Sequence, residues 1–340
     1  MRLSHQLTNV IMGKFFFLAA AGLLLCGDMC GQDWSVADSI VKYQMPSGGW
    51  PKNQNWKNGA DAAYMRRCRD TGVGSTIDNG ATTDEMRLLA KAYTATFDKR
   101  YRESFIKGLT YLLDMQYDNG GFPQFFPVRK EAPYSAHITF NDNAMVNVLR
   151  LLRDVSDEKE DFLALCVSES MRKRCAEAFN RGVQCILKCQ VKKNGKLTVW
   201  CQQHHEVSLE PVGARTYELP SLTGHGETVG IIMLLKDIPN PSQEVTRAVS
   251  SAVEWLREHA IRDMMIESFV NADGKKDKRL VNKKGAPLLW ARYYDLENEE
   301  PMFCDRDGIP KKHLEEIGYE RRNGYSWIGD TPQKVLDMVR

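Results

Sequence analysis

The segment YQMPSGGWPK (residues 43–52) decides the fold, because a related segment, QYDNGGFPQ (116–124), follows about seventy residues later. A weaker third copy is QVKKNGKLTVW (190–200). Each copy ends a helical stretch with glutamine, turns on glycine and then places an aromatic residue. The interval has room for two helices and their loops, so this period is typical of helix hairpins that stack on one another.

Outward from the repeat, apolar residues recur with a helical period over most of the chain. Helices are expected around 86–97, 99–117, 145–152, 171–190, 221–236, 242–260 and 331–339, and one strand at 196–203. We therefore predict an all-α fold, an (α/α)3 toroid built from helix-hairpin repeats. Residues 261–330 lose the helical period and are expected to form an irregular C-terminal segment that covers the rim. Trp50 and Phe122, next to the turns, are expected in the toroid core rather than against a sugar.

A polar segment that leads into a helix follows each copy of the repeat: TIDNG (76–80), TFNDN (139–143) and residues 217–226. Equivalent loops of stacked hairpins lie at the same end of the stack. Five polar segments are therefore expected to meet at one rim: 76–84, 139–143, 213–225, 290–293 and 304–307.

Two of these segments carry acidic pairs, Asp78 with Asn79 and Asp142 with Asn143, which we expect at matching places in the first two repeats. Asp and Asn are preferred helix caps, and capping alone would explain such pairs. Their clustered oxygens also suit Ca²⁺, which takes several hard ligands at flexible geometry. No EF-hand loop is present, so a calcium site would be assembled from separate loops.

Three arginines are expected at the same rim. Arg215 lies in the third polar loop, Arg292 in the aromatic stretch LWARYYDL (289–296), and Arg306 between two aspartates. Guanidinium groups bind carboxylates through two parallel hydrogen bonds. Ordinary surface salt bridges would explain Arg292 and Arg306 equally well.

The overall composition is that of an ordinary globular protein, with 43% hydrophobic and 26% charged residues. The net charge of +2 argues against a nucleic-acid partner, which usually requires a strong basic excess. An anionic ligand would need a local basic cluster.

The first 31 residues are expected to be a signal peptide, because Arg2 and Lys14 precede the apolar run FFFLAAAGLLL (15–25). The run is short for a membrane span, and no span is expected elsewhere. A buried core helix is the alternative, and a lipid anchor at Cys26 is disfavoured because a leucine precedes it. We therefore expect export to the periplasm, the cell surface or the medium. Residues 32–340 are expected to form one domain, and the protein is expected to be a monomer.

Seven short motifs run in order along nearly the whole mature chain: GGWPKN (48–53), IDNGATTDEM (77–86), NGGFPQFFP (119–127), ITFNDNAM (138–145), GARTYELPSL (213–222), LWARYYDL (289–296) and FCDRDG (303–308). Together they resemble the pectate lyases of polysaccharide lyase family ten. The resemblance implies that residues 32–340 are a catalytic domain with an (α/α)3 toroid. It also implies calcium as cofactor and cleavage of polygalacturonate by β-elimination.

The same resemblance assigns roles to individual residues. It implies Arg215 as the base that removes the C5 proton, with Asp78 also in the catalytic site. Calcium would be held by Asp142 and Asp78. The implied substrate-binding residues are Lys52, Asn79, Arg292 and Arg306. An arginine base is chemically demanding, because guanidinium is almost always protonated, and it predicts an alkaline pH optimum.

Three other functions fit parts of the sequence. A glycoside hydrolase would use Asp78 and Asp142 as its carboxylate pair, but it does not require the arginines. A non-catalytic glycan-binding protein would explain the leader and the aromatics, but not Arg215 together with the aspartates. A triterpene cyclase shares the Gln–Gly–aromatic repeat, but this chain is short for that enzyme and lacks its DxDD motif.

Overall fold

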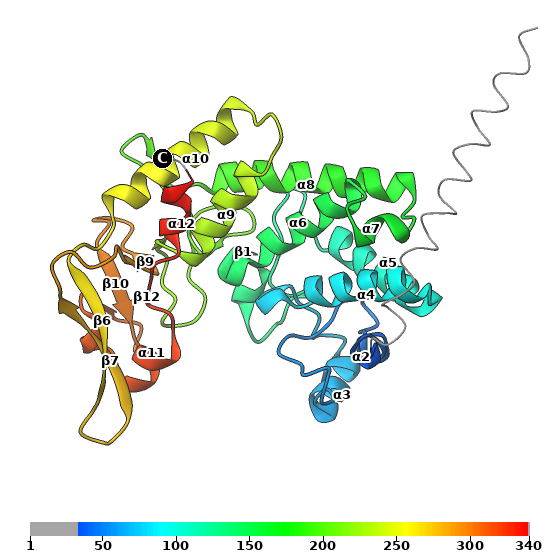
Figure 1. Cartoon of the computed structure of the whole chain (residues 1–340), viewed down its shortest axis with the longest axis horizontal. Helices are drawn as coiled ribbons and strands as arrows, with labels where there is room; N and C mark the ends of the chain where they lie inside the picture. The colour runs from blue at the N-terminus through cyan, green and yellow to red at the C-terminus, as the bar shows by residue number, and fades with distance from the viewer. Residues whose placement is uncertain (1–32, 339–340) are drawn as a thin grey trace, which may run out of the picture.

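The computed structural model describes residues 33–338, so the predicted signal peptide and Cys26 lie outside the described residues. Three helix hairpins form the body: α4 (Thr83–Thr96) with α5 (Lys99–Asp114), α6 (Ala144–Ser156) with α8 (Glu169–Cys189), and α9 (Gly226–Lys236) with α10 (Gln243–Glu258). Along one row α4 packs on α6 and α6 on α9, while α5 packs on α8 and α8 on α10 along the other. Figure 1 shows these hairpins following one another in an arc. The predicted hairpin-repeat fold of the (α/α)3 class is confirmed.

The remaining helices are shorter and flank the hairpins. They are α2 (Ser35–Tyr43), α3 (Ala62–Thr71), α7 (Asp161–Ala164), α11 (Tyr319–Gly324) and α12 (Pro332–Asp337), with 3-10 turns η1 (Asp78–Gly80), η2 (Pro133–Ala136), η3 (Asn141–Asn143) and η4 (Leu314–Glu316). Between residues 33 and 338 there is no helix with the length and apolar character needed to cross a bilayer.

The glutamine of each repeat holds the helix before it to the next hairpin. Gln44 Nε2 donates to the carbonyl of Gly48 in its own turn, at 2.7 Å, and to the carbonyl of Ser104 on α5, at 2.8 Å. The other two copies repeat this double contact: Gln116 with Gly120 and with Ala178 on α8, and Gln190 with Thr198 and with Ala248 on α10. The amide therefore satisfies buried carbonyls at each junction of the arc.

The glycine of the turn allows this close approach. Gly120 has a φ of +92°, and a Cβ at this position would lie 2.1 Å from the carbonyl oxygen of Arg181 on α8. Gly48 makes the same approach to Lys107 on α5 with a φ of +105°. Glycine is favoured here both for its backbone conformation and because no side chain fits.

The aromatic residue of the turn lies in the core, as predicted for Trp50 and Phe122, which are fully buried. The indole N–H of Trp50 donates to the carbonyl of Ile40 on α2 at 2.8 Å. Two further tryptophans make the same contact with a preceding helix: Trp200 with Ile186 on α8, and Trp290 with Leu256 on α10. Each turn is thereby fastened to the carboxyl-terminal half of the helix before it.

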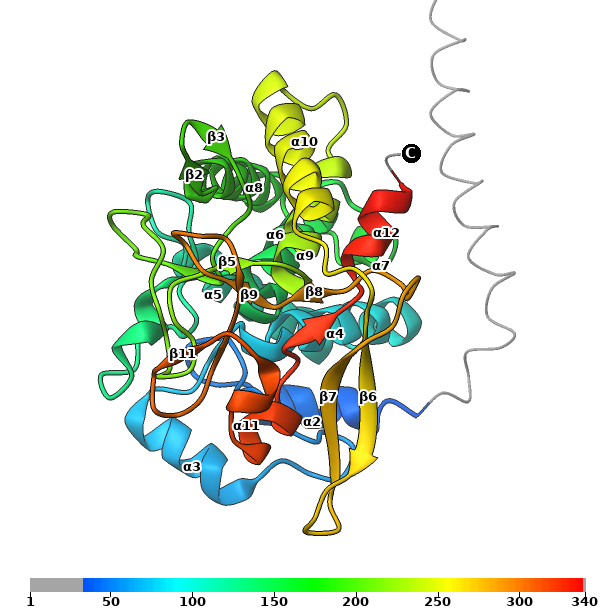
Figure 2. The same ribbon diagram turned by 90° about the vertical axis from the view of Figure 1, so that its left-hand side faces the viewer.

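The C-terminal segment is more regular than expected. A long hairpin of β6 (Met264–Val270) and β7 (Lys276–Asn282) projects from the body (Figure 2). The other strands are short: β5 (Leu222–Thr223), β8 (Trp290–Ala291), β9 (Tyr293–Tyr294), β10 (Pro301–Cys304), β11 (Pro310–Lys311) and β12 (Ile328–Gly329). They pair in the order β11-β10-β9-β5, with β12 on β8. Strands of two residues leave no period that a sequence pattern could reveal.

One local prediction was wrong. The single strand expected at 196–203 is divided: β3 (Lys196–Leu197) pairs with β2 (Lys192–Lys193), and β4 (Gln203–His204) pairs with β1 (Ile138–Thr139). At the end of the chain, Thr331 is the N-cap residue of α12, and Pro332 follows it in the first turn. The threonine hydroxyl makes no capping hydrogen bond, however, and has no partner among the described residues.

Candidate active site

The three polar loops that follow the repeats have equivalent backbone contacts, and they lead into α4, α6 and α9 in the same way. The backbone N–H of Thr76 donates to the carbonyl of Trp50 at 3.1 Å. The same bond joins Thr139 to Phe122 at 3.1 Å and Thr223 to Trp200 at 2.8 Å. Two residues beyond each threonine stands a buried polar side chain: Asp78, Asn141 and His225. The loops that carry Asp78 and Asn141, η1 and η3, pack against each other, and α9 packs against η3.

This register corrects the expected matching of the acidic pairs by one residue. Asp78 is equivalent to Asn141, and Asn79 is equivalent to Asp142. Asn79 and Asp142 both have left-handed backbone conformations, with φ values of +54° and +50°. The capping interpretation is also wrong, because neither α4 nor α6 receives a side-chain capping bond at its N-cap. The two aspartates therefore have different environments.

Asp78 is buried, and its one cationic partner among the described residues is the ammonium group of Lys52. Its Oδ2 forms an ion pair with Lys52, whereas its Oδ1 is buried without a hydrogen-bond partner in the described chain. Asn79 is exposed, and its amide donates to Asn53 Oδ1 at 3.0 Å. Of the predicted substrate-binding residues, Lys52 and Asn79 thus lie beside Asp78.

Asp142 is the more accessible carboxylate, with its side chain 41% exposed. Asn141 donates to its Oδ2 at 2.8 Å, and the Arg292 guanidinium lies 3.5 Å from its Oδ1. Partial burial raises the pKa of Asp142; Arg292 opposes this shift, and the charges of Glu227 and Asp78 add to it. The carboxylate therefore has capacity for a further positive charge.

Arg292 lies between Glu227, Asn141, Asp142 and Tyr325. It forms a buried ion pair with Glu227, donates to Asn141 Oδ1 at 2.9 Å and lies 4.6 Å from the centroid of the Tyr325 ring. Burial would lower the pKa of Arg292, but Glu227 outweighs it and keeps the pKa well above its usual value. Arg292 therefore has salt-bridge partners in both Glu227 and Asp142, and its role in binding a substrate carboxylate stays a prediction.

Arg215 is bound to Glu218, three residues later. The Glu218 carboxylate accepts from the backbone N–H of Arg215 at 3.2 Å, from its Nε at 2.6 Å and from its Nη2. Partial burial would lower the pKa of Arg215, but the hydrogen bonds to Glu218 raise it above its usual value. Tyr325 also donates to Glu218, at 3.0 Å, so Arg215 and Arg292 are joined through this one tyrosine.

Three guanidinium groups lie against the ring of Tyr217. The Cζ atoms of Arg215, Arg306 and Arg321 lie 5.1, 5.7 and 4.6 Å from its centroid. Arg306 is 63% exposed and forms two hydrogen bonds with Glu320, at 3.0 and 3.1 Å. Cation–π contacts of this kind orient the cations, and they place Arg306 and Arg215 in one cluster.

The predicted residues therefore form a continuous arrangement of contacts, from Arg306 and Arg215 through Tyr325 and Arg292 to Asp142. The packing of η1 on η3 then places Asp78 and Lys52 beside it. Asn141 belongs to the polar segment 139–143 that the sequence indicated. Sequence reasoning missed three other members of this arrangement, Glu227, Arg321 and Tyr325, because they depend on pairings across long stretches of sequence.

The oxygen atoms fit a calcium ion in part. Residues 33–338 hold no group of three or more His, Cys, Asp or Glu side chains placed to bind a metal. Asp142 and the unpartnered Oδ1 of Asp78 are hard oxygen ligands, but Ca²⁺ takes six to eight oxygens. The protein residues therefore fit calcium only together with oxygens from a carboxylate ligand and from water.

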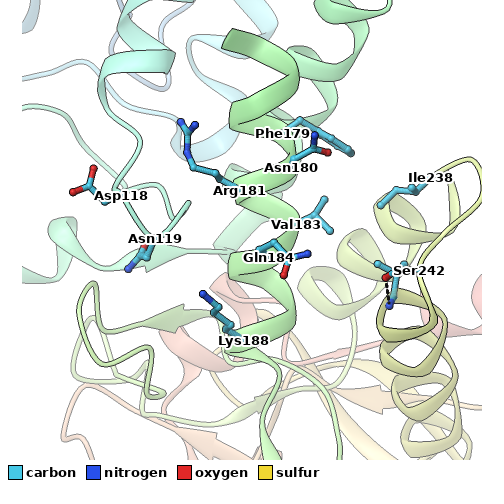
Figure 3. Close-up of a pocket in the computed structure, with 11 residues that line it drawn as sticks. Asp118, Asn119, Phe179, Asn180, Arg181, Val183, Gln184, Lys188, Ile238 and Ser242 are labelled. Carbon is cyan, nitrogen blue, oxygen red and sulfur yellow. Dashed lines mark hydrogen bonds between the residues drawn. The ribbon is translucent and has the colours of Figure 1, made fainter. Parts of the chain in front are cut away.

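A separate hollow lies away from this arrangement (Figure 3). It is formed by Phe179, Val183 and Lys188 of α8, with Ile238 and Ser242 of the loop between α9 and α10. None of the predicted site residues lines it, so it is not the candidate active site.

Comparison with known proteins identifies the family. A family model described as pectic acid lyase matches residues 44–336. The chain belongs to the pectic acid lyase family. A search of the curated proteins found no match. Membership makes this protein a polysaccharide lyase of the pectate lyase type, as the seven motifs predicted.

Two solved structures of family members are similar over almost the whole chain. One is a family 10 polysaccharide lyase from Cellvibrio cellulosa, with 34% identity and a TM-score of 0.78, covering 92% of this chain and 92% of that one. The other is a variant of a family 10 lyase from the same organism in complex with trigalacturonic acid. It has the same identity and TM-score, covering 91% of this chain and 93% of that one.

Proposed function

We propose that this pectate lyase cleaves polygalacturonate by calcium-assisted β-elimination, with Arg215 as the base. The observation that carries the proposal is the contact arrangement from Arg306 and Arg215 to Arg292 and Asp142. It gathers three guanidinium groups, each paired with a glutamate of its own, beside the more exposed carboxylate of Asp142, where we expect an anionic polymer and a bridging cation to bind. The solved complex of the related lyase variant with trigalacturonic acid supports the same substrate class.

The reaction begins at C5 of a galacturonate unit, whose proton is weakly acidic because it lies α to the carboxylate. Arg292 and Arg306 bind substrate carboxylates, which fixes the sugar and disperses the negative charge that develops. Bound calcium, held by Asp142 and by Oδ1 of Asp78 with substrate oxygens, would add positive charge at the same carboxylate. Lys52 and Asn79 contact neighbouring hydroxyl or carboxylate groups of the polygalacturonate substrate.

Arg215 then takes the C5 proton, a double bond forms between C4 and C5, and the C4–O bond of the glycosidic link breaks. Glu218 favours the protonated guanidinium, so the base function demands surroundings that favour the neutral form. The nearby Arg306 and Arg321 and the bound cation act in that direction. An alkaline pH optimum follows, because the neutral fraction of Arg215 grows with pH.

The deciding experiment is incubation of the purified protein with polygalacturonate, with and without a calcium chelator. The unsaturated product of a lyase absorbs ultraviolet light, whereas a hydrolase using Asp78 and Asp142 would release reducing ends without that absorbance. Full turnover in excess chelator would remove calcium from the mechanism. We also propose that the protein is exported through its N-terminal segment, acts as a monomer and meets its polymeric substrate outside the cytoplasm.

A further inference from the structure

A second pocket, of about 230 Å³, lies between α3 and the loop that follows Phe125. Two of its lining residues are arginines, Arg67 on α3 and Arg129 on the loop. Tyr64 and Phe125 contribute its aromatic wall. None of the residues assigned above to catalysis, calcium or substrate lines this pocket.

The charge around the pocket is positive. Burial raises the pKa of Tyr64, and the charges of both Arg129 and Arg67 oppose that shift, which places both cations within electrostatic range of one hydroxyl. Glu131 pairs with Arg129 at 2.9 Å but is itself 64% exposed. Arg67 has no acidic partner within residues 33–338. Two guanidinium groups with a single exposed carboxylate favour an anionic ligand.

The pocket adjoins the candidate active site through Phe125. The ring of Phe125 lies 5.2 Å from Arg129 Cζ and 6.0 Å from Lys52 Nζ, the cation that pairs with Asp78. The backbone of Phe125 also pairs with Thr76, two residues before Asp78. A polymer held at Lys52 and Asp78 therefore passes beside the pocket when it extends in this direction.

We propose that this pocket is an outer subsite that binds the carboxylate of a galacturonate unit beyond those at the cleaved bond. The proposal rests on the proposed function and adds Arg67 and Arg129 to the residues that select the substrate. The bound carboxylate accepts from Arg67 and replaces Glu131 at Arg129. A methyl-esterified unit lacks that charge, so the pocket also favours demethylated chains.

The test compares single substitutions over galacturonate chains of increasing length, from the shortest one cleaved to the polymer. Arg67→Gln and Arg129→Gln each remove one cation from the pocket. Arg66→Gln is the matched control, because Arg66 is an exposed neighbour on the same helix, outside the pocket lining. Formation of the unsaturated product gives kcat and KM, and circular dichroism checks each fold.

We expect Arg67→Gln and Arg129→Gln to lower kcat/KM about three- to tenfold on the polymer, through KM, and to leave the shortest substrate unaffected. Glu131→Gln removes the competing carboxylate and should raise kcat/KM on the polymer about twofold. Arg66→Gln should match the unsubstituted protein at every length, and methyl-esterified pectin should lose the dependence on Arg67.

The inference is overturned if the two pocket variants match Arg66→Gln on the polymer, or if their losses are equal at all lengths. A fall in activity for Glu131→Gln would contradict the competition between this carboxylate and the substrate. In each of these cases the unsubstituted protein still forms the unsaturated product. If it forms none from any substrate, the proposed function itself fails.

Discussion

Glu218 controls both the position and the charge of Arg215, so Glu218→Gln is the most informative single change. The carboxylate is 1% exposed and accepts three hydrogen bonds from Arg215 and one from Tyr325. An amide of the same shape keeps one acceptor and brings two donors. At least one contact with Arg215 or Tyr325 is therefore lost, and the ion pair is lost entirely.

The size of the effect on stability follows from burial. A hydrogen bond to a charged group contributes about 1.5–3 kcal/mol, and an exposed ion pair about 1 kcal/mol or less. The Arg215 side chain is 42% exposed, so water recovers part of its lost contacts. We expect a loss of about 1–2 kcal/mol in the free energy of unfolding, which lowers Tm by about 2–3 °C in a domain of this size.

The effect on catalysis is larger and has a distinct signature. Loss of orientation should lower kcat about 10- to 100-fold with KM nearly unchanged, because a misplaced catalytic group affects the chemical step. The pKa of Arg215 falls when Glu218 no longer raises it, so the alkaline optimum should move to lower pH. The assay is the pH profile of kcat on polygalacturonate, with Tm from calorimetry. An unchanged optimum together with full kcat would refute the role given to Glu218.

Three further predictions concern the same region. Arg215→Ala should fold normally and lose nearly all kcat on polygalacturonate, and Arg215→Lys should not restore it, because an ammonium cannot reproduce the planar guanidinium; wild-type kcat in either variant would exclude the base role. Arg306→Ala should raise KM with little change in Tm, whereas Arg292→Ala should also lower the free energy of unfolding by about 3–5 kcal/mol, because it leaves Glu227 buried and unpaired; equal Tm values for the two variants would contradict this contrast. Burial raises the pKa of Glu85 to about 7; the unfolded chain then loses its proton first as pH rises, so stability should fall between about pH 4.5 and 7. Glu85→Gln should flatten that part of the curve of unfolding free energy against pH, and an unaltered slope would show that Glu85 is not the group responsible.

The sequence predicted the hairpin repeat because its signal is local. Each repeat has its glutamine beside its own glycine turn, at Gln44, Gln116 and Gln190. Each of these glutamines makes the same contact with a following helix, which is α5, α8 or α10. The short strands of the C-terminal segment could not be predicted, because their pairing partners are remote in the sequence. β5 at Leu222–Thr223 pairs with β9 at Tyr293–Tyr294, with no periodic pattern in either.

The candidate site was predicted in its residue types but not in its partners. The residues predicted for the site belong to short motifs that are recognisable because all seven occur in order along the chain, namely Asp78, Asp142, Arg215, Arg292 and Arg306. Their ionic partners, by contrast, follow from the packing of separate elements, as when β9 lies beside β5 and brings Arg292 to Glu227. The one-residue shift between the acidic pairs could have been found in the sequence, because aligning Thr76 with Thr139 places Asp78 opposite Asn141.

The central claim is that Arg215 acts in calcium-assisted β-elimination on polygalacturonate. The most direct measurement is the ultraviolet absorbance of the unsaturated product, followed for the unsubstituted protein and for Arg215→Ala, each with calcium and with excess chelator. The account predicts a steady rise for the unsubstituted protein with calcium and almost none in the other three reactions. Release of reducing ends without that absorbance, or an equal rise in Arg215→Ala, would contradict it.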